Sequence, residues 1–377
     1  MKDELESNLL GRLLDLAARK TTDMEPADSR VPVTNYLSPE RLERELDTLF
    51  RDRPVVIDHA ERVREPGSFV THDVGRVPLL VLRDRTGTLR GFLNVCRHRG
   101  ARLVLEEQGV LRGETLACPY HSWAYRHDGR LAHVPHADAF PSVRCEETAL
   151  ASIAVQERHG LVWALPRPGL AFDLDASLGP FADDLASLGL ADHVVRAQMT
   201  VERNLNWKLA VELFLESYHV QRVHKCLDPR RFLDNVVALD LHGPHVRYAT
   251  ARRPLLAALE GTKSARLREV ASLVYLFFPN TLMLVESDYV GLATYLPAGV
   301  DRTIARLMLL VPQDDDRPRE YWDKNVEIFF KVHDEDFTVG ESIQRGLRSG
   351  ANEQLTFGRF EHALKRFQAN VAEALGV

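Results

Sequence analysis

The sequence predicts an α+β protein in which a small all-β domain precedes a larger antiparallel sheet that carries helices. Short apolar runs separated by turn residues fill the first half of the chain, and a helical pattern fills its C-terminal end. The 377 residues also exceed what one hydrophobic core usually supports, so we expect two domains.

Residues 1–50 are predicted to form helices that pack on the larger domain. Leucines recur at helical spacing at positions 5, 9, 13 and 16, which is typical of the apolar face of a helix. A second helix is expected over residues 39–50, with Ser38 as its N-cap and Pro39 at the first helical position.

Residues 51–166 are predicted to form the all-β domain. Strand-like runs alternate there with turns, which include the segment 84–87 and the pairs Asp128-Gly129 and His159-Gly160. The strands expected on either side of these turns are 77–82 and 89–95, then 123–125 and a strand at Leu131, then 152–156 and 161–165.

Residues 167–377 are predicted to form the larger domain. Loop and short helix are expected first, followed by a strand at 194–201 and a long helix from Asn206 onward. The last part of the chain, from 319 to 375, is expected to be largely helical. The apolar runs predicted as strands of one antiparallel sheet are 245–249, 271–278, 281–285 and 303–311.

Composition excludes some classes of protein. The 48 basic and 54 acidic residues give a net charge of −6, whereas phosphate binding requires a basic face, so we expect no nucleic-acid partner. The longest apolar runs, 273–278 and 307–311, have the length of core strands and cannot cross a bilayer. The first residues are acidic and lack an apolar signal segment, which favours a cytoplasmic location without a membrane partner.

Two cysteine–histidine pairs form the first candidate metal site. Cys96 and His98 follow the order C-x-H, and Cys118 and His121 follow C-x-x-H, in two turns of the expected β domain. Two thiolates and two imidazoles suit a tetrahedral zinc ion or a [2Fe–2S] cluster in which two histidines hold one iron. Zinc fingers pair cysteine with cysteine and histidine with histidine, whereas such a cluster needs one of each from each loop, so the order favours the cluster.

The flanking residues resemble the Rieske domain of ring-hydroxylating oxygenases. That pattern is C-x-H-R-G in the first loop and C-P-Y-H-x-W in the second, and residues 98–100 and 119–121 match it. Ser122 departs from the pattern, because the family often has glycine there. The resemblance implies that the cluster is bound by Cys96, His98, Cys118 and His121.

The second candidate site lies in the expected long helix. Glu216 and His219 are three residues apart and share a helix face, whereas His219 and His224 are five apart, which an ideal helix turns by about 140°. Both histidines can hold one metal only if the helix ends or distorts between them. Two histidines and one carboxylate bind Fe(II) and leave open positions for dioxygen and substrate. The carboxylate must come from elsewhere, and the run 333–337 and Glu341 offer candidates.

This segment resembles the N-W-K…E-x-Y-H-x-x-x-x-H signature of the oxygenase α subunits, and the later acidic run resembles their E-D-x…E-x-x-Q-x-G signature. The resemblance implies a mononuclear Fe(II) held by His219, His224 and Asp336, with Asp334 as the alternative third ligand. It also implies the fold, a Rieske domain followed by a catalytic domain with a helix-grip-like antiparallel sheet and helices.

Glu216 matches the bridging carboxylate of that family. The resemblance implies that it links His219 to His121 of the partner subunit, fixes the imidazole and offers a short hydrogen-bonded path for one electron. Similar proteins form ring-shaped trimers, so we expect a homotrimer. Leu213 departs from an asparagine that is common in related proteins.

The resemblance covers nearly the whole chain and implies a terminal oxygenase. An NAD(P)H-dependent reductase or a ferredoxin would supply electrons, and O2 would be used to hydroxylate or dihydroxylate a small organic substrate. No G-x-G-x-x-G fingerprint follows a strand, and Cys145 and Cys226 are too few for a ferredoxin cluster, so the reductase is expected to be a separate protein. The alternatives are a Rieske electron-transfer protein without a second iron and a colourless zinc-binding module.

A small aromatic acid or hydrophobic ring compound is the expected substrate. The alternative is N-dealkylation or oxygenation of a quaternary amine, because Glu216, rather than aspartate, is also found in members that act on such amines. An aromatic cage would then be needed. The cavity is expected to be lined by 212–224 and 274–295, with an apolar wall formed by Phe277, Phe278, Leu282 and Leu284.

Overall fold

The protein is described by a computed structural model that covers residues 3–228, 230–262 and 265–377. These residues divide into two compact units, which are described separately. One unit is Leu46–Leu174, and the other combines Met1–Glu45 with Asp175–Val377. The all-β unit is therefore inserted, in sequence, between two parts of the other unit.

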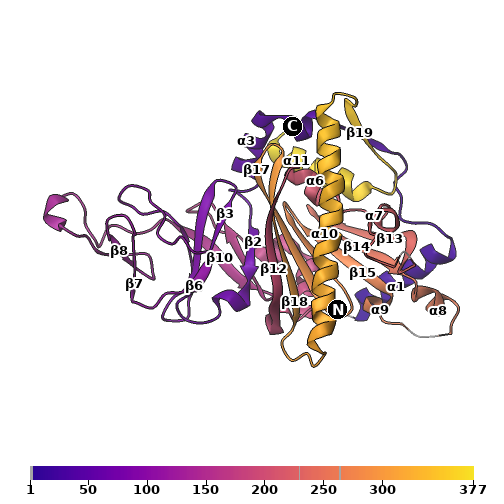
Figure 1. Cartoon of the computed structure of the whole chain (residues 1–377), viewed down its shortest axis with the longest axis horizontal. Helices are drawn as coiled ribbons and strands as arrows, with labels where there is room; N and C mark the ends of the chain where they lie inside the picture. The colour runs from indigo at the N-terminus through magenta and orange to yellow at the C-terminus, as the bar shows by residue number, and fades with distance from the viewer. Residues whose placement is uncertain (1–2, 229, 263–264) are drawn as a thin grey trace. The chain divides into compact units, whose positions relative to one another are not determined.

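The Leu46–Leu174 unit is built from two antiparallel sheets (Figure 1). Its elements are β2 (Val55–His59), η1 (Ala60–Val63), β3 (Ser68–Val74), β4 (Val77–Arg83), β5 (Leu89–Leu93), β6 (Gln108–Val110), β7 (Thr115–Ala117), β8 (Ala124–Arg126), β9 (Leu131–His133), η2 (Ala137–Ala139), β10 (Ser152–Arg158) and β11 (Leu161–Leu165). The strand orders are β2-β11-β10-β5-β4-β3-β6 and β7-β8-β9. The hairpins β4–β5, β8–β9 and β10–β11 confirm the predicted turns.

The other unit is organised around one seven-stranded antiparallel sheet in the order β12-β18-β17-β16-β15-β14-β13. The strands are β12 (His193–Arg203), β13 (Phe232–His242), β14 (His245–Arg252), β15 (Ala271–Phe277), β16 (Thr281–Val285), β17 (Val290–Gly299) and β18 (Arg302–Pro312). Every residue of β14 and β15 is buried, so both faces of the sheet are covered there. The long helix α10 (Arg319–Arg348) lies across the sheet (Figure 1). This α+β architecture confirms the predicted fold class.

Helices and one small sheet complete this unit. They are α1 (Asp3–Ala18), β1 (Ser29–Pro32), α2 (Thr34–Leu37), α3 (Pro39–Thr48), α4 (Leu174–Leu178), α5 (Pro180–Ser187), η3 (Leu190–Asp192), α8 (Leu255–Leu259), α9 (Leu267–Val270), β19 (Gln354–Phe357) and α11 (His362–Leu375). The backbone of Arg41 donates to Ser38 Oγ at 3.0 Å, which confirms the predicted cap of α3. The side chains of Leu9, Leu13 and Leu16 are buried. The side chain of Leu5 is not among the side chains that the structure describes.

The prediction of one long helix from Asn206 onward was wrong. The helix α6 (Trp207–Glu212) ends after six residues, and α7 (Val220–Val223) is a single short turn. Tyr248 on β14 donates its hydroxyl to the Phe214 carbonyl at 2.5 Å, which satisfies a backbone group that a continuous helix would have paired internally. The contact with the sheet therefore replaces a hydrogen bond that is lost where the helix ends, and the chain changes direction between the two helices.

In the part of the chain that the structure describes, none of the helices combines the length and apolar character needed to cross a bilayer.

Candidate metal centres

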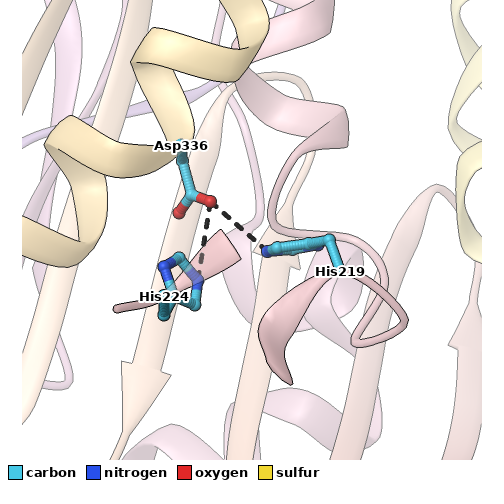
Figure 2. A group of neighbouring side chains, drawn as sticks. All are labelled: His219, His224 and Asp336. Carbon is cyan, nitrogen blue, oxygen red and sulfur yellow. Dashed lines mark ion pairs between the residues drawn. The ribbon is translucent and has the colours of Figure 1, made fainter. Parts of the chain in front are cut away.

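Three side chains from two segments converge beside the central sheet. His219 directly precedes α7 and His224 directly follows it, while Asp336 comes from α10 (Figure 2). The Nε2 atoms of His219 and His224 lie 3.3 and 3.5 Å from the same Asp336 oxygen. Among the described residues, these form the one group of three metal-ligand side chains whose ligand atoms all lie within 4.8 Å of one another. The end of α7 between the histidines meets the geometric demand set by their spacing.

The charge distribution at this triad fits a bound cation. Asp336 is 1% exposed, and both of its carboxylate oxygens lack a well-formed hydrogen bond. Burial lowers the pKa of His219, but the carboxylates of Asp336 and Glu216 outweigh burial and raise it to about 10. A buried carboxylate is costly unless it is paired, and two imidazoles with one carboxylate are a ligand set typical of non-heme Fe(II).

Each histidine of the triad is oriented by a further carboxylate. His219 Nδ1 donates to Glu216, whose second oxygen accepts the backbone N–H of His219 at 3.1 Å. His224 Nδ1 lies 3.2 Å from Glu335, which also accepts the backbone N–H of Lys225 at 3.2 Å. A carboxylate on Nδ1 leaves the Nε2 lone pair free for a metal. The sequence indicated Glu335 only as a member of the acidic run, and its contact with His224 was not predicted.

Asp334, the alternative third ligand, points elsewhere. It forms an ion pair with Arg203 and has a side chain that is 57% exposed. Leu213 lines the cavity beside the triad, so the position where relatives often carry asparagine is apolar here.

The four cysteine and histidine side chains of the other unit lie in two loops of matching geometry. In the first loop, the backbone N–H of Cys96 donates to the Ala101 carbonyl at 2.8 Å, and in the second Cys118 donates to Trp123 at 2.8 Å. The fourth residue after each cysteine has a left-handed backbone, with φ of 79° at Gly100 and 57° at Ser122. The two loops therefore hold their cysteines in the same backbone turn, while the histidine is the second residue after the cysteine in one loop and the third in the other.

The groups in these loops fit a sulfur-bridged two-iron cluster. Cys96 and Cys118 are each 3% exposed and are not in a disulfide. The Nδ1 atoms of His98 and His121 are shielded from solvent without a hydrogen-bond partner, and their ring centroids are 4.7 Å apart. No three of these four ligand atoms lie within 4.8 Å of one another, as a single tetrahedral zinc ion would require.

The hydroxyl of Tyr125 lies 3.3 Å from Cys96 Sγ and accepts the backbone N–H of Arg97 at 3.0 Å. Tyr125 is fully buried, and burial raises the pKa of its hydroxyl, which therefore keeps a proton that it can donate to a cysteine thiolate. The sequence motifs did not predict this contact, because no local signal connects Tyr125 to Cys96.

A cavity of about 110 Å³ lies against the triad. Its wall comes from the break between α6 and α7, from β13, β14, β15 and β16, and from α10. It includes Phe214, Phe232, Tyr248, Leu284 and Phe329. Of the four residues expected to form an apolar wall, Leu284 lines this cavity, whereas Phe277, Phe278 and Leu282 are buried core residues outside it.

Comparison with known proteins identifies the family. The model for the Rieske [2Fe–2S] domain matches residues 53–147, and the model for the ring hydroxylating alpha subunit (catalytic domain) matches residues 190–376. The chain belongs to the Rieske non-heme iron oxygenases. As a Rieske oxygenase it is an oxidoreductase, the terminal component that receives electrons from a reductase partner and uses O2, with a [2Fe–2S] cluster and a mononuclear iron as its cofactors.

Several relatives of this Rieske oxygenase resemble it along most of their length. The glycine betaine monooxygenase oxygenase subunit of Pseudomonas aeruginosa is 27% identical, with 91% of this chain and 88% of the relative covered. The carnitine monooxygenase oxygenase subunit of Acinetobacter pittii is 26% identical, with 91% and 94% covered.

Two solved structures share the fold. A quaternary ammonium Rieske monooxygenase superposes with a TM-score of 0.82 at 23% identity, over 93% of this chain and 96% of the other. Naphthalene 1,2-dioxygenase from Rhodococcus sp. superposes with a TM-score of 0.77 at 20% identity, over 99% and 98%.

Proposed function

We propose that His219, His224 and Asp336 bind the mononuclear iron, and that Cys96, His98, Cys118 and His121 bind the cluster. The observation that carries the proposal is the convergence of both histidine Nε2 atoms on one oxygen of a buried aspartate. When bound, the cluster supplies single electrons, and the iron activates dioxygen.

The chain's own residues prepare the iron site. Glu216 accepts a hydrogen bond from Nδ1–H of His219, and Glu335 accepts one from Nδ1–H of His224. These bonds fix the tautomer and the orientation of both rings. The side chain of Glu216 is 13% exposed, and each of its oxygens retains a lone pair beyond its contact with His219. These features support the role of Glu216 as the link to His121 of the partner subunit in a homotrimer.

The substrate is proposed to be a small organic molecule that is oxygenated in the cavity beside the triad. An aromatic substrate is supported by the apolar and aromatic wall that Phe214, Leu284 and Phe329 provide. A quaternary amine, oxygenated or N-dealkylated, is the second candidate, supported by the names of the betaine and carnitine relatives. Rings such as Phe214 and Phe329 can also face a methylated ammonium group.

The test of this function combines metal content with turnover. The purified holoenzyme is expected to hold about three irons and two acid-labile sulfides per chain. With a generic reductase and NADH, it should consume O2 and form oxygenated products from an aromatic or a methylamine panel.

Asp336→Asn should lose the mononuclear iron and all product formation while the Rieske absorbance is unchanged. Asp334→Asn is the matched control, because its ion pair with Arg203 lies outside the triad. Product formation by the Asp336→Asn variant at the wild-type rate would refute the proposed iron site.

Three points stay predictions. They are the homotrimer, the redox partner, which is a ferredoxin or an NAD(P)H-dependent reductase, and the cytoplasmic location. Sedimentation of the holoenzyme tests the first, since a fully active monomer would contradict transfer of electrons between subunits.

A further inference from the structure

The cavity beside the iron triad meets a second and wider cavity of about 660 Å³. Arg231, Glu286, Tyr289 and Asn325 line both cavities and therefore mark where the two meet. The inner cavity is mainly apolar, whereas ion pairs dominate this junction. A ligand that reaches the iron from the outer cavity passes these polar groups.

The described residues that line the outer cavity include four arginines and four carboxylates, but two of the arginines gather around the carboxylate of Glu286 at the junction. The carboxylate of Glu286 is 5% exposed and accepts from Arg231 at 2.8 Å, from Arg252 at 3.1 Å and from the hydroxyl of Ser272 at 2.6 Å. Two guanidinium groups thus share one carboxylate. Asp288, which lines the outer cavity, is engaged by Tyr321 and by Arg317 at 3.2 Å, so it does not offset this excess.

Arg231 is the group at this junction that can reach a ligand. Its side chain is 38% exposed, whereas that of Arg252 is 8% exposed and is occupied by Glu286, Ser287 and a backbone carbonyl. A guanidinium group binds a carboxylate through two parallel hydrogen bonds, and a second carboxylate behind it holds its plane in place. Because the charge of Glu286 is already compensated twice, a cationic group gains little from it.

We infer that Arg231 binds the carboxylate of the substrate, and that the substrates are small organic acids whose apolar part extends along the inner cavity towards the iron triad. This inference rests on the proposed function. It applies to an aromatic acid and to a betaine, since both have a carboxylate. Glu286 and Arg252 act as positioning residues for the Arg231 guanidinium.

The test compares acids with counterparts that lack the carboxylate. The holoenzyme is titrated in a calorimeter with benzoate, phenylacetate and glycine betaine, and with benzamide, phenylacetamide and choline. At least one acid should bind about 10–100-fold more tightly than its counterpart, the range expected for a charge-assisted hydrogen-bonded pair. Equal binding within all pairs would overturn the inference.

Arg231→Gln should remove this preference, whereas Arg231→Lys should restore part of it. Arg230→Gln is the matched control, because Arg230 lines only the outer cavity and pairs with Asp228 at 3.0 Å. Retention of the mononuclear iron verifies that the unit containing each substitution is folded, and Rieske absorbance verifies the unit Leu46–Leu174.

Glu286→Gln separates ligand binding from a merely structural ion pair. It removes the ion pair between Arg231 and Glu286 but keeps the guanidinium group, so acid binding should weaken less than in Arg231→Gln, because only the positioning of the guanidinium is lost. Equal weakening by Glu286→Gln and Arg231→Gln would overturn the inference. Calorimetry does not depend on turnover, so failure to form oxygenated products would refute the proposed function and leave the binding result standing.

Discussion

The two carboxylates that orient the iron triad differ in how they reach it. Glu216 is three residues from His219 and belongs to the same turn of the chain, whereas Glu335 reaches His224 from α10, 111 residues further along. Glu335 also lies 3.4 Å from Cys226 Sγ and accepts from the backbone of Lys225. The aim of His224 therefore depends on the position of α10, which also supplies Asp336.

Glu335→Gln is expected to weaken binding of Fe(II) to the mononuclear site by about 10–100-fold, because losing the carboxylate on Nδ1 lowers the basicity and order of the His224 ring. Competition with a chelator of known affinity measures the constant. Asp334→Asn, one residue away and paired with Arg203, should leave it unchanged. Equal affinity in the Glu335→Gln and wild-type proteins would show that His224 needs no such partner.

At the level of single residues, a motif predicts side chains that are close in sequence. Cys96 and His98 were predicted as a pair because their short spacing places them in one loop. His219 and His224 were predicted as a pair because their segment resembles the family signature, although their spacing required the helix to end between them. Glu335 and Arg231 were not given these roles, since each depends on which distant segment packs against it. Spacing alone contains no information on such packing.

The two cluster loops impose the same backbone requirement on different residues. Gly100 adopts the left-handed conformation without a side-chain clash, whereas Ser122 adopts it with a Cβ atom. This difference gives a physical meaning to the departure of Ser122 from the glycine of related proteins.

Ser122→Gly is therefore expected to stabilise the Leu46–Leu174 unit, the Rieske unit, by about 0.5–1 kcal/mol. Relief of the steric cost of a left-handed backbone at a residue with a Cβ atom exceeds the entropy that glycine adds to the unfolded chain. Loss of cluster absorbance on heating measures the effect. Ser152→Gly in strand β10 is the control, and it should destabilise by a similar amount because strand glycine is unfavourable. A lower melting temperature for Ser122→Gly would contradict this reasoning.

Elements defined by local signals could be predicted, and elements defined by distant contacts could not. The β8–β9 hairpin depends on Asp128 and on Gly129, whose φ is 89°, so two residues suffice to indicate it. The break after α6 depends on the contact between Tyr248 and the Phe214 carbonyl, which no helical periodicity indicates. Strand β13 lies at the edge of its sheet with a mixed burial pattern, and it was missed because alternation there is weak.

At the scale of the molecule, Glu212 ties three distant parts of the chain together. Its buried carboxylate accepts from Tyr36 at 3.0 Å and from Gln368 at 2.5 Å, so it joins the N-terminal segment, α6 and α11. Burial raises the pKa of Glu212 to about 7, although these two hydrogen bonds oppose the shift.

The stability of this junction should depend on pH. Because the folded pKa exceeds the reference value of 4.5, the folded protein keeps a proton that the unfolded chain releases, and stability falls as pH rises from about 4.5 to 7. Glu212→Gln should remove this term, so its stability relative to wild type should rise by about 2–3 kcal/mol between pH 5 and pH 8. Urea unfolding followed by tryptophan fluorescence measures it, and a difference that does not vary with pH would exclude a buried titrating carboxyl.

The insertion of the Rieske unit between Glu45 and Asp175 sets an order of events during synthesis of the protein. The buried Glu45 carboxylate pairs with Arg41 within α3 and also with Lys208, which is 163 residues further along the chain. At about 5–20 residues per second, the ribosome needs roughly 8–30 s to add that stretch. The Rieske unit is therefore complete in the emerging polypeptide, and available for cluster loading, before Glu45 of α3 can pair with Lys208.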